Sequence, residues 1–114
     1  MAECLFCKIV NGELSSDIVY DDETVIAFKD INPQAPHHIL IIPRRHIASV
    51  SEVSAEDEPL LGHLCGVAAR LAEKIGVAET GYRLVVNSGP HGGQAVEHLH
   101  VHLLAGRQLT WPPG

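Results

Sequence analysis

The sequence has little positive charge for its length. Its 114 residues carry 8 Lys and Arg against 14 Asp and Glu, which gives a formal net charge of −6. Sequence-independent affinity for DNA or RNA comes largely from clustered basic side chains that neutralise phosphates, so this balance argues against a nucleic acid polymer as the ligand. A small anionic ligand that is held by backbone groups remains allowed.

Cysteines are few and odd in number. With three of them, and only Cys4 and Cys7 close together, a fully paired disulfide framework is excluded. The first residues carry an acid and two thiols before any apolar stretch, so they lack the pattern of a secretory signal. No apolar run approaches the roughly 20 residues that cross a bilayer. We therefore expect no membrane association and a cytoplasmic location.

No repeat, low-complexity segment or linker interrupts the chain, and we expect one domain over residues 1–114. Apolar periodicity and turn signals predict a short helix, a two-stranded hairpin, a proline-containing loop, a third strand, one long helix and two final strands. In that order the elements span residues 4–10, 17–20, 24–28, 30–36, 38–42, 60–75, 82–87 and 98–104. This pattern indicates an α+β fold with a mainly antiparallel sheet.

Histidine is the residue type in excess, with as many copies (8) as Lys and Arg together. His98, His100 and His102 alternate with aliphatic residues, so in a strand the three imidazoles share one face, about 7 Å apart. A half-exposed strand explains this pattern without any chemistry. Three imidazoles in register nevertheless favour a reactive site, because neutral imidazole can act as nucleophile, acid, base or metal ligand.

Two chemistries fit this face. In one, His100 and His102 with a third imidazole hold a catalytic Zn²⁺ that activates water. In the other, one imidazole attacks phosphorus and forms a covalent intermediate while its neighbours manage protons. Gly89, Gly92 and Gly93 favour the second chemistry, because glycines let backbone N–H groups cradle phosphate oxygens. The same glycines also fit an ordinary hairpin connection.

Two further residues are candidates for this site. His38 begins the third expected strand and is a plausible fourth histidine of the cluster. Asn87 ends the strand that enters the glycine-containing loop, where its amide could orient the nucleophile or bind a ribose or phosphate oxygen. An asparagine at the end of a strand is also a common turn cap.

Residues 98–104 resemble the signature of the histidine triad family, in which three histidines alternate with apolar residues. Residues 106–108 (Gly-Arg-Gln) and 111–114 (Trp-Pro-Pro-Gly) resemble the Hint branch of that family, the purine nucleoside phosphoramidases. The likeness covers nearly the whole chain. It implies a five-stranded antiparallel sheet with one long and one short helix, joined to the sheet of a second copy in a homodimer.

The resemblance also implies a reaction, with a purine nucleoside monophosphate or its phosphoramidate as the bound partner. His100 would attack the α-phosphorus of a purine nucleoside 5′-phosphoramidate, expel an amine and leave a nucleotidyl-imidazole that water hydrolyses. His102 would contact the phosphate and the leaving group, and the carbonyl of His98 would hold His100 in its nucleophilic tautomer. His38 would complete the proton network. No cofactor is required for this chemistry.

Positions that bind the nucleotide follow from the same resemblance. Asp30 would bind the ribose hydroxyls beside an apolar slot for the base. The phosphate would be held by backbone N–H groups at Gly93, Gln94, Ala95 and Val96, with Asn87 nearby. The slot would be lined by Phe6, Ile9, Phe28, Ile31 and Leu40, and Trp111 is counted with the nucleotide-binding residues.

Two other functions remain open beside phosphoramidate hydrolysis. Ala95 stands where the branch commonly places a serine hydroxyl beside the scissile bond. The loss of that hydroxyl makes a nucleotide-binding module with incidental catalysis credible. A dinucleoside polyphosphate hydrolase uses the same triad but usually lacks the Trp-Pro-Pro-Gly ending.

A structural zinc site is the remaining expectation. Cys4 and Cys7 have ligand spacing, and zinc-containing relatives combine such a pair with two histidines at the positions of His46 and His98. Two thiolates and two imidazoles would form a closed tetrahedral site with no position left for a reactive water. The alternative is that both cysteines are small apolar residues of the first helix.

Overall fold

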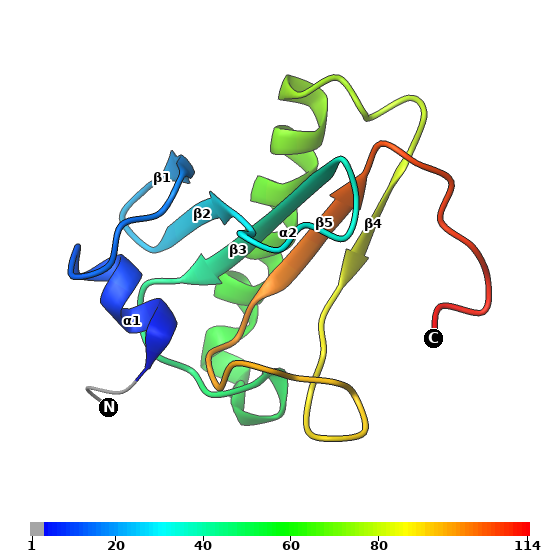
Figure 1. Cartoon of the computed structure of the whole chain (residues 1–114). Coiled ribbons are helices and arrows are strands. Elements are labelled where there is room, and N and C mark those ends of the chain that lie inside the picture. The colour runs from blue at the N-terminus through cyan, green and yellow to red at the C-terminus, as the bar shows by residue number, and fades with distance from the viewer. Residues whose placement is uncertain (1–3) are drawn as a thin grey trace.

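The computed structural model describes residues 4–114, and a single antiparallel sheet forms its centre (Figure 1). Within these residues the helices and strands follow the order α1 (Leu5–Val10), β1 (Ile18–Asp21), β2 (Val25–Lys29), β3 (His37–Pro43), α2 (Glu58–Lys74), β4 (Tyr82–Val85) and β5 (Val101–Ala105), with 3-10 turns at Val50–Glu52 and Ala55–Asp57. The expected α+β fold with a five-stranded sheet is confirmed. None of the helices in this part of the chain has the length and apolar character needed to cross a membrane.

The strand order in the sheet is β1-β2-β3-β5-β4, and every neighbouring pair is antiparallel. The chain forms the β1–β2–β3 meander first, then crosses the sheet through α2 and returns with β4 and β5. This crossover brings β5 beside β3 at the middle of the sheet. The third expected strand and the last one, far apart in sequence, are therefore direct neighbours.

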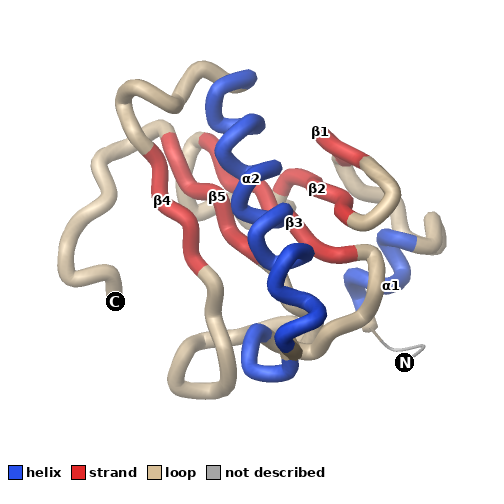
Figure 2. Tube along the Cα trace, turned by 180° about the vertical axis from the view of Figure 1, so that it is seen from behind, coloured by secondary structure: helices blue, strands red, loops and turns tan. Residues whose placement is uncertain are grey.

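Helix α2 covers one face of the sheet, as the view from behind shows (Figure 2). Its apolar positions recur at helical spacing, so one stripe of the helix faces the strands. The buried core on this side contains Leu64, Val67 and Leu71 of α2, together with Leu99 and residues of β2, β3 and β5. Each such aliphatic side chain contributes roughly 1.5–3 kcal/mol by leaving water.

The opposite face carries α1 and a smaller apolar cluster. Phe6 and Ile9 of α1 pack against Ile26, Phe28, Leu40 and Ile42 of β2 and β3. The thiol of Cys4 accepts a hydrogen bond from the Cys7 N–H at 3.3 Å, which caps the first turn of α1. The short helix is thus anchored at its start by the pair of cysteines and along its length by Phe6 and Ile9.

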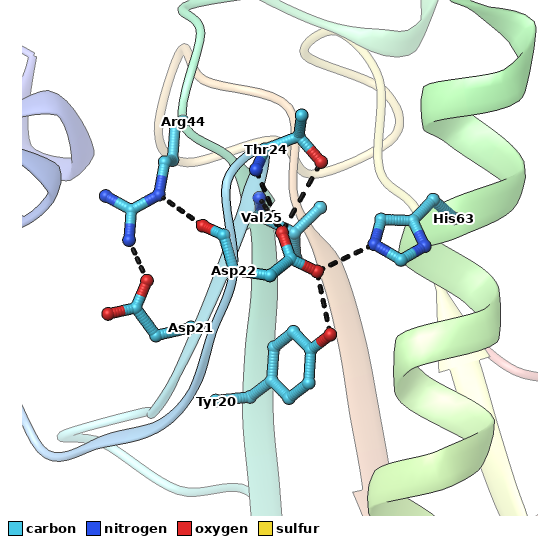
Figure 3. Close-up of polar contacts among 7 residues, drawn as sticks. All are labelled: Tyr20, Asp21, Asp22, Thr24, Val25, Arg44 and His63. Atoms are coloured by element: carbon cyan, nitrogen blue, oxygen red, sulfur yellow. Dashed lines mark hydrogen bonds and ion pairs between the residues drawn. The ribbon is translucent and has the colours of Figure 1, made fainter.

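Asp22 ties the β1–β2 hairpin to α2 (Figure 3). Its carboxylate accepts hydrogen bonds from Tyr20 Oη at 2.7 Å and His63 Nε2 at 2.8 Å, and also from the backbone N–H groups of Thr24 and Val25. Burial alone would raise the pKa of Asp22, but these hydrogen bonds outweigh it and hold the pKa well below its usual range. One of the histidines without an expected role, His63, is therefore a structural link.

The element boundaries differ from the sequence-based expectation in two places that matter for the site. The last strand begins at Val101 and not at His98, because the Leu99 N–H donates to Ile47 O at 2.6 Å instead of entering the ladder with β3. The fourth strand ends at Val85, so Asn87 lies two residues beyond it. The expected alternation of faces still holds, since Leu99, Val101 and Leu103 are all buried in the core beneath α2.

Candidate active site

The register of β3 and β5 brings two of the expected histidines together. Leu40 pairs with His102 and His38 pairs with Leu104, so His38 and His102 lie one diagonal step apart on the face opposite α2. Their rings meet there, with His38 Nε2 2.9 Å from His102 Nδ1. The side chain of His38 is only 4 % exposed.

The backbone of Gln34 determines which way this hydrogen bond runs. Its N–H donates to His38 Nδ1 at 3.0 Å, so that nitrogen must be an acceptor. Neutral His38 then carries its proton on Nε2 and donates to His102 Nδ1. It follows that neutral His102 carries its own proton on Nε2.

His102 Nε2 is buried and has no hydrogen-bond partner among the described residues. An unpaired N–H donor in a protein interior costs free energy, roughly 1–3 kcal/mol, and such groups cluster where a ligand supplies the missing partner. The atom is therefore suited to meet an acceptor on a bound molecule.

His100 has the opposite arrangement of its two ring nitrogens. Its Nδ1 lies 2.6 Å from the carbonyl oxygen of His98. Because a carbonyl can only accept, Nδ1 carries the proton and Nε2 keeps its lone pair. The rings of His100 and His102 stand 4.9 Å apart between centroids, so a free lone pair and a free N–H donor lie side by side.

The surroundings of His102 and His38 lower the pKa of both side chains and so favour their neutral forms. Burial, together with the nearby His100 and His38 rings, lowers the pKa of His102 to about 4, and the Asp30 carboxylate opposes this shift only in part. Burial also lowers the pKa of His38, which the Asp30 carboxylate 3.5 Å away opposes. A neutral imidazole is the form that can attack or donate a single proton.

The loop before the histidines leaves only part of its backbone free. Gly93 N–H donates to Pro90 O and Gln94 N–H donates to Gly89 O, each at 3.1 Å. The N–H groups of Ala95 and Val96 have no acceptor within the described part of the chain. Of the four residues whose backbone N–H groups are expected to hold phosphate, only Ala95 and Val96 therefore have an N–H that is free to bind a ligand.

Gln94 braces the same loop with its side chain. Its Oε1 accepts from Gly89 N–H at 3.1 Å, and its Nε2 donates to Ala48 O at 2.7 Å and Val96 O at 3.0 Å. All of the amide's hydrogen atoms are therefore used inside the protein. The side chain supports the loop and is not directed at a ligand.

The expected base-binding residues fall into two groups. Phe6, Ile9, Phe28 and Leu40 share the apolar cluster under α1, with Val96 packed against it, and the Phe6 ring lies edge-on to His100 with centroids 5.2 Å apart. Ile31 and Trp111 stand outside this cluster and are 96 % and 81 % exposed. Asn87 is half-buried, and its side chain has no hydrogen bond to any described residue.

The two cysteines, His46 and His98 form a second cluster next to the triad. Cys4 Sγ and Cys7 Sγ lie 3.3 and 3.6 Å from His98 Nδ1, and Cys7 Sγ lies 3.3 Å from His46 Nδ1. His98 Nε2 is 2.9 Å from Pro43 O, so it must donate, and Nδ1 presents its lone pair to the thiols. The first histidine of the triad thus turns its ring away from His100 and reaches that residue only through its carbonyl.

The donor set fits a tetrahedral zinc ion. All four ligand atoms lie within 4.8 Å of one another. For Zn–S near 2.3 Å and Zn–N near 2.0–2.1 Å, tetrahedral geometry puts sulfur and nitrogen about 3.5 Å apart, close to the distances seen here. In the protein alone, burial and the neighbouring Cys4 raise the pKa of Cys7 to about 11; a divalent cation would instead favour both thiolates.

The Gln34 N–H that orients His38 is a polar group of the site that the sequence did not predict. No pattern of side chains in the sequence indicates this contact, because a backbone group donates the hydrogen bond. His98, His100 and His102 do not converge on one point as three ligands among the described residues. The three residues place a free lone pair on His100 beside a free N–H on His102, and they do not form a three-histidine metal site.

Comparison with known proteins identifies the family of the chain. The HIT domain family matches residues 11–109. The purine nucleoside phosphoramidase of Escherichia coli K12 is 57% identical over 107 residues, which are 94% of this chain and 90% of that protein. A HIT-like protein of Synechococcus elongatus is 52% identical over 98% of this chain and 97% of its own length.

Solved structures share the fold over the same span. A HIT family hydrolase from Legionella pneumophila superposes with a TM-score of 0.96 at 52% identity, covering 98% of this chain and all (100%) of the other. A histidine triad protein from Clostridium difficile gives a TM-score of 0.94 at 43% identity over 96% of each chain. With the triad geometry in place, the chain belongs to the HIT domain family.

Proposed function

We propose that this single-domain protein is a hydrolase that cleaves the P–N bond of purine nucleoside 5′-phosphoramidates through a covalent intermediate on His100. The observation that carries the proposal is the pairing of His100, whose Nε2 is free, with His102, whose buried Nε2–H has no partner. The 57% identity to a purine nucleoside phosphoramidase supports the substrate class.

The reaction would run in two displacements at phosphorus. The His100 Nε2 lone pair attacks the α-phosphorus, the P–N bond breaks and the amine leaves. The leaving nitrogen takes the His102 Nε2–H proton and departs as a neutral amine, and the water of the second step returns a proton to His102. Water then hydrolyses the nucleotidyl-imidazole, releases the nucleoside monophosphate and restores His100.

The remaining residues would bind and orient the nucleotide. The free N–H groups of Ala95 and Val96 are suited to phosphate oxygens, since backbone donors hold an anion without a charged side chain. Asp30 has a side chain that is 20 % exposed and can accept hydrogen bonds from the ribose hydroxyls. The base would lie against Phe6 and Phe28, and Ile31 is free to cover it from the solvent side.

Zinc would have a structural role in this scheme. Cys4, Cys7, His46 and His98 would hold it and leave no position for a reactive water. Bound there, the ion would fasten α1 to the segment that carries the triad. Each step at phosphorus is assigned to His100 and His102, which lie outside the metal shell. His98 is shared, because its side chain would bind the metal while its backbone carbonyl holds His100 Nδ1.

A homodimer would complete the assembly through β4. This strand pairs only with β5 among the described strands, so its other edge has free backbone groups. The opposite edge of the sheet, β1, is irregular, with a register shift between Ile18 and Tyr20 that discourages pairing. Two β4 edges would join the sheets into one.

Ala95 supports a second candidate, a nucleotide-binding module with incidental turnover. No hydroxyl stands at this position to assist the leaving group. Incubation with adenosine 5′-phosphoramidate, followed by chromatography of released AMP, distinguishes the two. The hydrolase releases AMP in many turnovers per chain, and His100→Ala does not. Binding of AMP without turnover would instead favour the module.

A further inference from the structure

The turn after β5 lies directly against the loop that precedes β3. Gly106 has a φ of 99°, and a Cβ there would meet Pro36 Cβ at 2.8 Å and the His37 ring at 3.3 Å. Only glycine permits both the backbone conformation and the close approach. The next residue, Arg107, therefore begins within reach of the loop's backbone.

Arg107 holds the carbonyl of Gln34 with two hydrogen bonds. Its Nε and Nη2 lie 3.1 and 3.0 Å from Gln34 O, although 73 positions separate the residues in sequence. A guanidinium has five N–H donors and no acceptor, so the direction of both bonds is certain. The Gln34 side chain is occupied elsewhere, on Asn32 O at 3.0 Å.

These contacts complete a row of hydrogen bonds that ends at the site. Arg107 donates to Gln34 O, Gln34 N–H donates to His38 Nδ1, and His38 Nε2–H donates to His102 Nδ1. The last two donors, Gln34 N–H and His38 Nε2–H, each leave the imidazole that accepts their hydrogen bond with one possible proton position. The last of these is the buried His102 Nε2–H.

We propose that Arg107 is a positioning residue: by holding Gln34 it keeps His38 in the tautomer that makes His102 a hydrogen-bond donor toward the substrate. If Gln34 turned away, His38 Nδ1 could carry the proton. The bond between the two histidines would then reverse, and His102 Nε2 would become an acceptor with nothing to offer a leaving nitrogen. The claim that Arg107 sets the tautomers of His38 and His102 stands on the geometry alone, while its consequence for catalysis rests on the proposed function.

The test compares Arg107→Ala with Arg83→Ala. Arg83 is a matched control, because its Nη2 donates to Thr110 O at 2.9 Å and so holds the same C-terminal segment without touching Gln34. Nitrogen-15 NMR of the imidazoles, in the full-length protein without substrate, reports the tautomers. We expect His38 and His102 as Nε2–H in the wild type and in Arg83→Ala, and a mixture with Nδ1–H in Arg107→Ala. Gel filtration checks that all three proteins have the same oligomeric state.

Kinetics supply the second readout. With adenosine 5′-phosphoramidate, Arg107→Ala should lower kcat about tenfold, part of the effect of a positioned proton donor, with KM within about twofold. Arg107→Lys, which has one donor group in place of the fork, should fall between Arg107→Ala and the wild type. Added guanidinium ion should restore part of the kcat of Arg107→Ala.

Two results would overturn the inference. One is an unchanged tautomer population in Arg107→Ala. The other is an Arg107→Ala variant that melts at a lower temperature than the wild type but has wild-type tautomers and, at temperatures where it is folded, wild-type kcat. That result would make Arg107 a structural anchor only. If the wild type itself released no AMP, the proposed function would fail, and the NMR comparison would still decide the role of Arg107.

Discussion

The carbonyl oxygen of His98 lies 2.6 Å from Nδ1 of His100, while the ring of His98 faces the thiols of Cys4 and Cys7. One residue therefore belongs to two sites, with its backbone to the triad and with its side chain to the cysteine and histidine cluster. A change at the thiols can therefore reach His100, the proposed nucleophile, through His98 alone.

The cluster should bind one zinc ion per chain. We expect elemental analysis to find it in the wild type and to find little in Cys7→Ser, whose melting temperature should also fall because metal binding adds to folding free energy. The control is Cys65→Ser, since Cys65 is an exposed free cysteine on α2 outside the cluster. Equal metal content in Cys7→Ser and the wild type would exclude the assigned ligand set.

The lowered pKa of His102 should appear in the pH dependence of stability. Its pKa is about 4 in the folded protein and near 6.5 when unfolded, so between these values the unfolded chain binds more protons. The free energy of unfolding should then rise with pH from about 4 to about 6.5. Urea unfolding of His102→Asn should show a shallower rise over this window.

His91→Asn is the control for that slope, because His91 is exposed in the loop and has no hydrogen bond within the described structure. Its pH dependence should match the wild type. A slope in His102→Asn as steep as that of the wild type would contradict a buried, neutral His102.

The fold and the grouping of several candidate site residues on one face could be predicted from the sequence, because both depend on local patterns. The alternation of His98, His100 and His102 with aliphatic residues gave the two faces correctly, since a strand side that must be buried cannot slip by one residue. The α2 stripe around Leu64, Val67 and Leu71 was equally plain, because helical spacing marks a buried face.

The rest depends on contacts that no local pattern encodes. The segment before Val101 leaves the ladder because Leu99 N–H finds Ile47 O, a partner from a distant loop. The direction of the His38 to His102 bond comes from the backbone of Gln34. Backbone N–H and C=O groups are the same in nearly every residue, so the sequence does not show which of them will make these contacts, and only the folded structure reveals them.

Asp22 should matter for stability and not for turnover. Asp22→Asn removes the charge that accepts hydrogen bonds from Tyr20 and His63 and should lower the free energy of unfolding by about 1–3 kcal/mol at pH 7. Because the pKa of Asp22 is lowered by folding, the wild type keeps this contribution above about pH 4 and loses it as the pH falls further. The two proteins should converge in acid.

Glu23→Gln is the matched variant, since Glu23 is the exposed acidic neighbour in the same turn. It should leave the denaturation midpoint unchanged. If Asp22→Asn were as stable as Glu23→Gln at pH 7, the link between the hairpin and α2 would contribute nothing measurable.

The proposed dimer should depend on the β4 edge. Two copies of 12.3 kDa give about 25 kDa in sedimentation or light scattering. Tyr82→Lys combined with Val86→Lys places charges beside that edge, where both side chains are exposed, and should yield monomers. Ile18→Lys, on the β1 edge, is the control and should leave the mass of the dimer unchanged. If Ile18→Lys were monomeric and the β4 variant dimeric, the dimer interface would lie at β1 and not at β4.

The central claim is that the reaction passes through a nucleotide bound to His100. Its most direct measurement is rapid mixing with adenosine 5′-phosphoramidate, an alkaline quench that preserves a phosphorus–imidazole bond, and mass spectrometry of the protein and its peptides. The account predicts an adenylyl group on the peptide that contains His100, absent from His100→Ala. Release of AMP by the wild type with no adduct, or by His100→Ala at the wild-type rate, would contradict it.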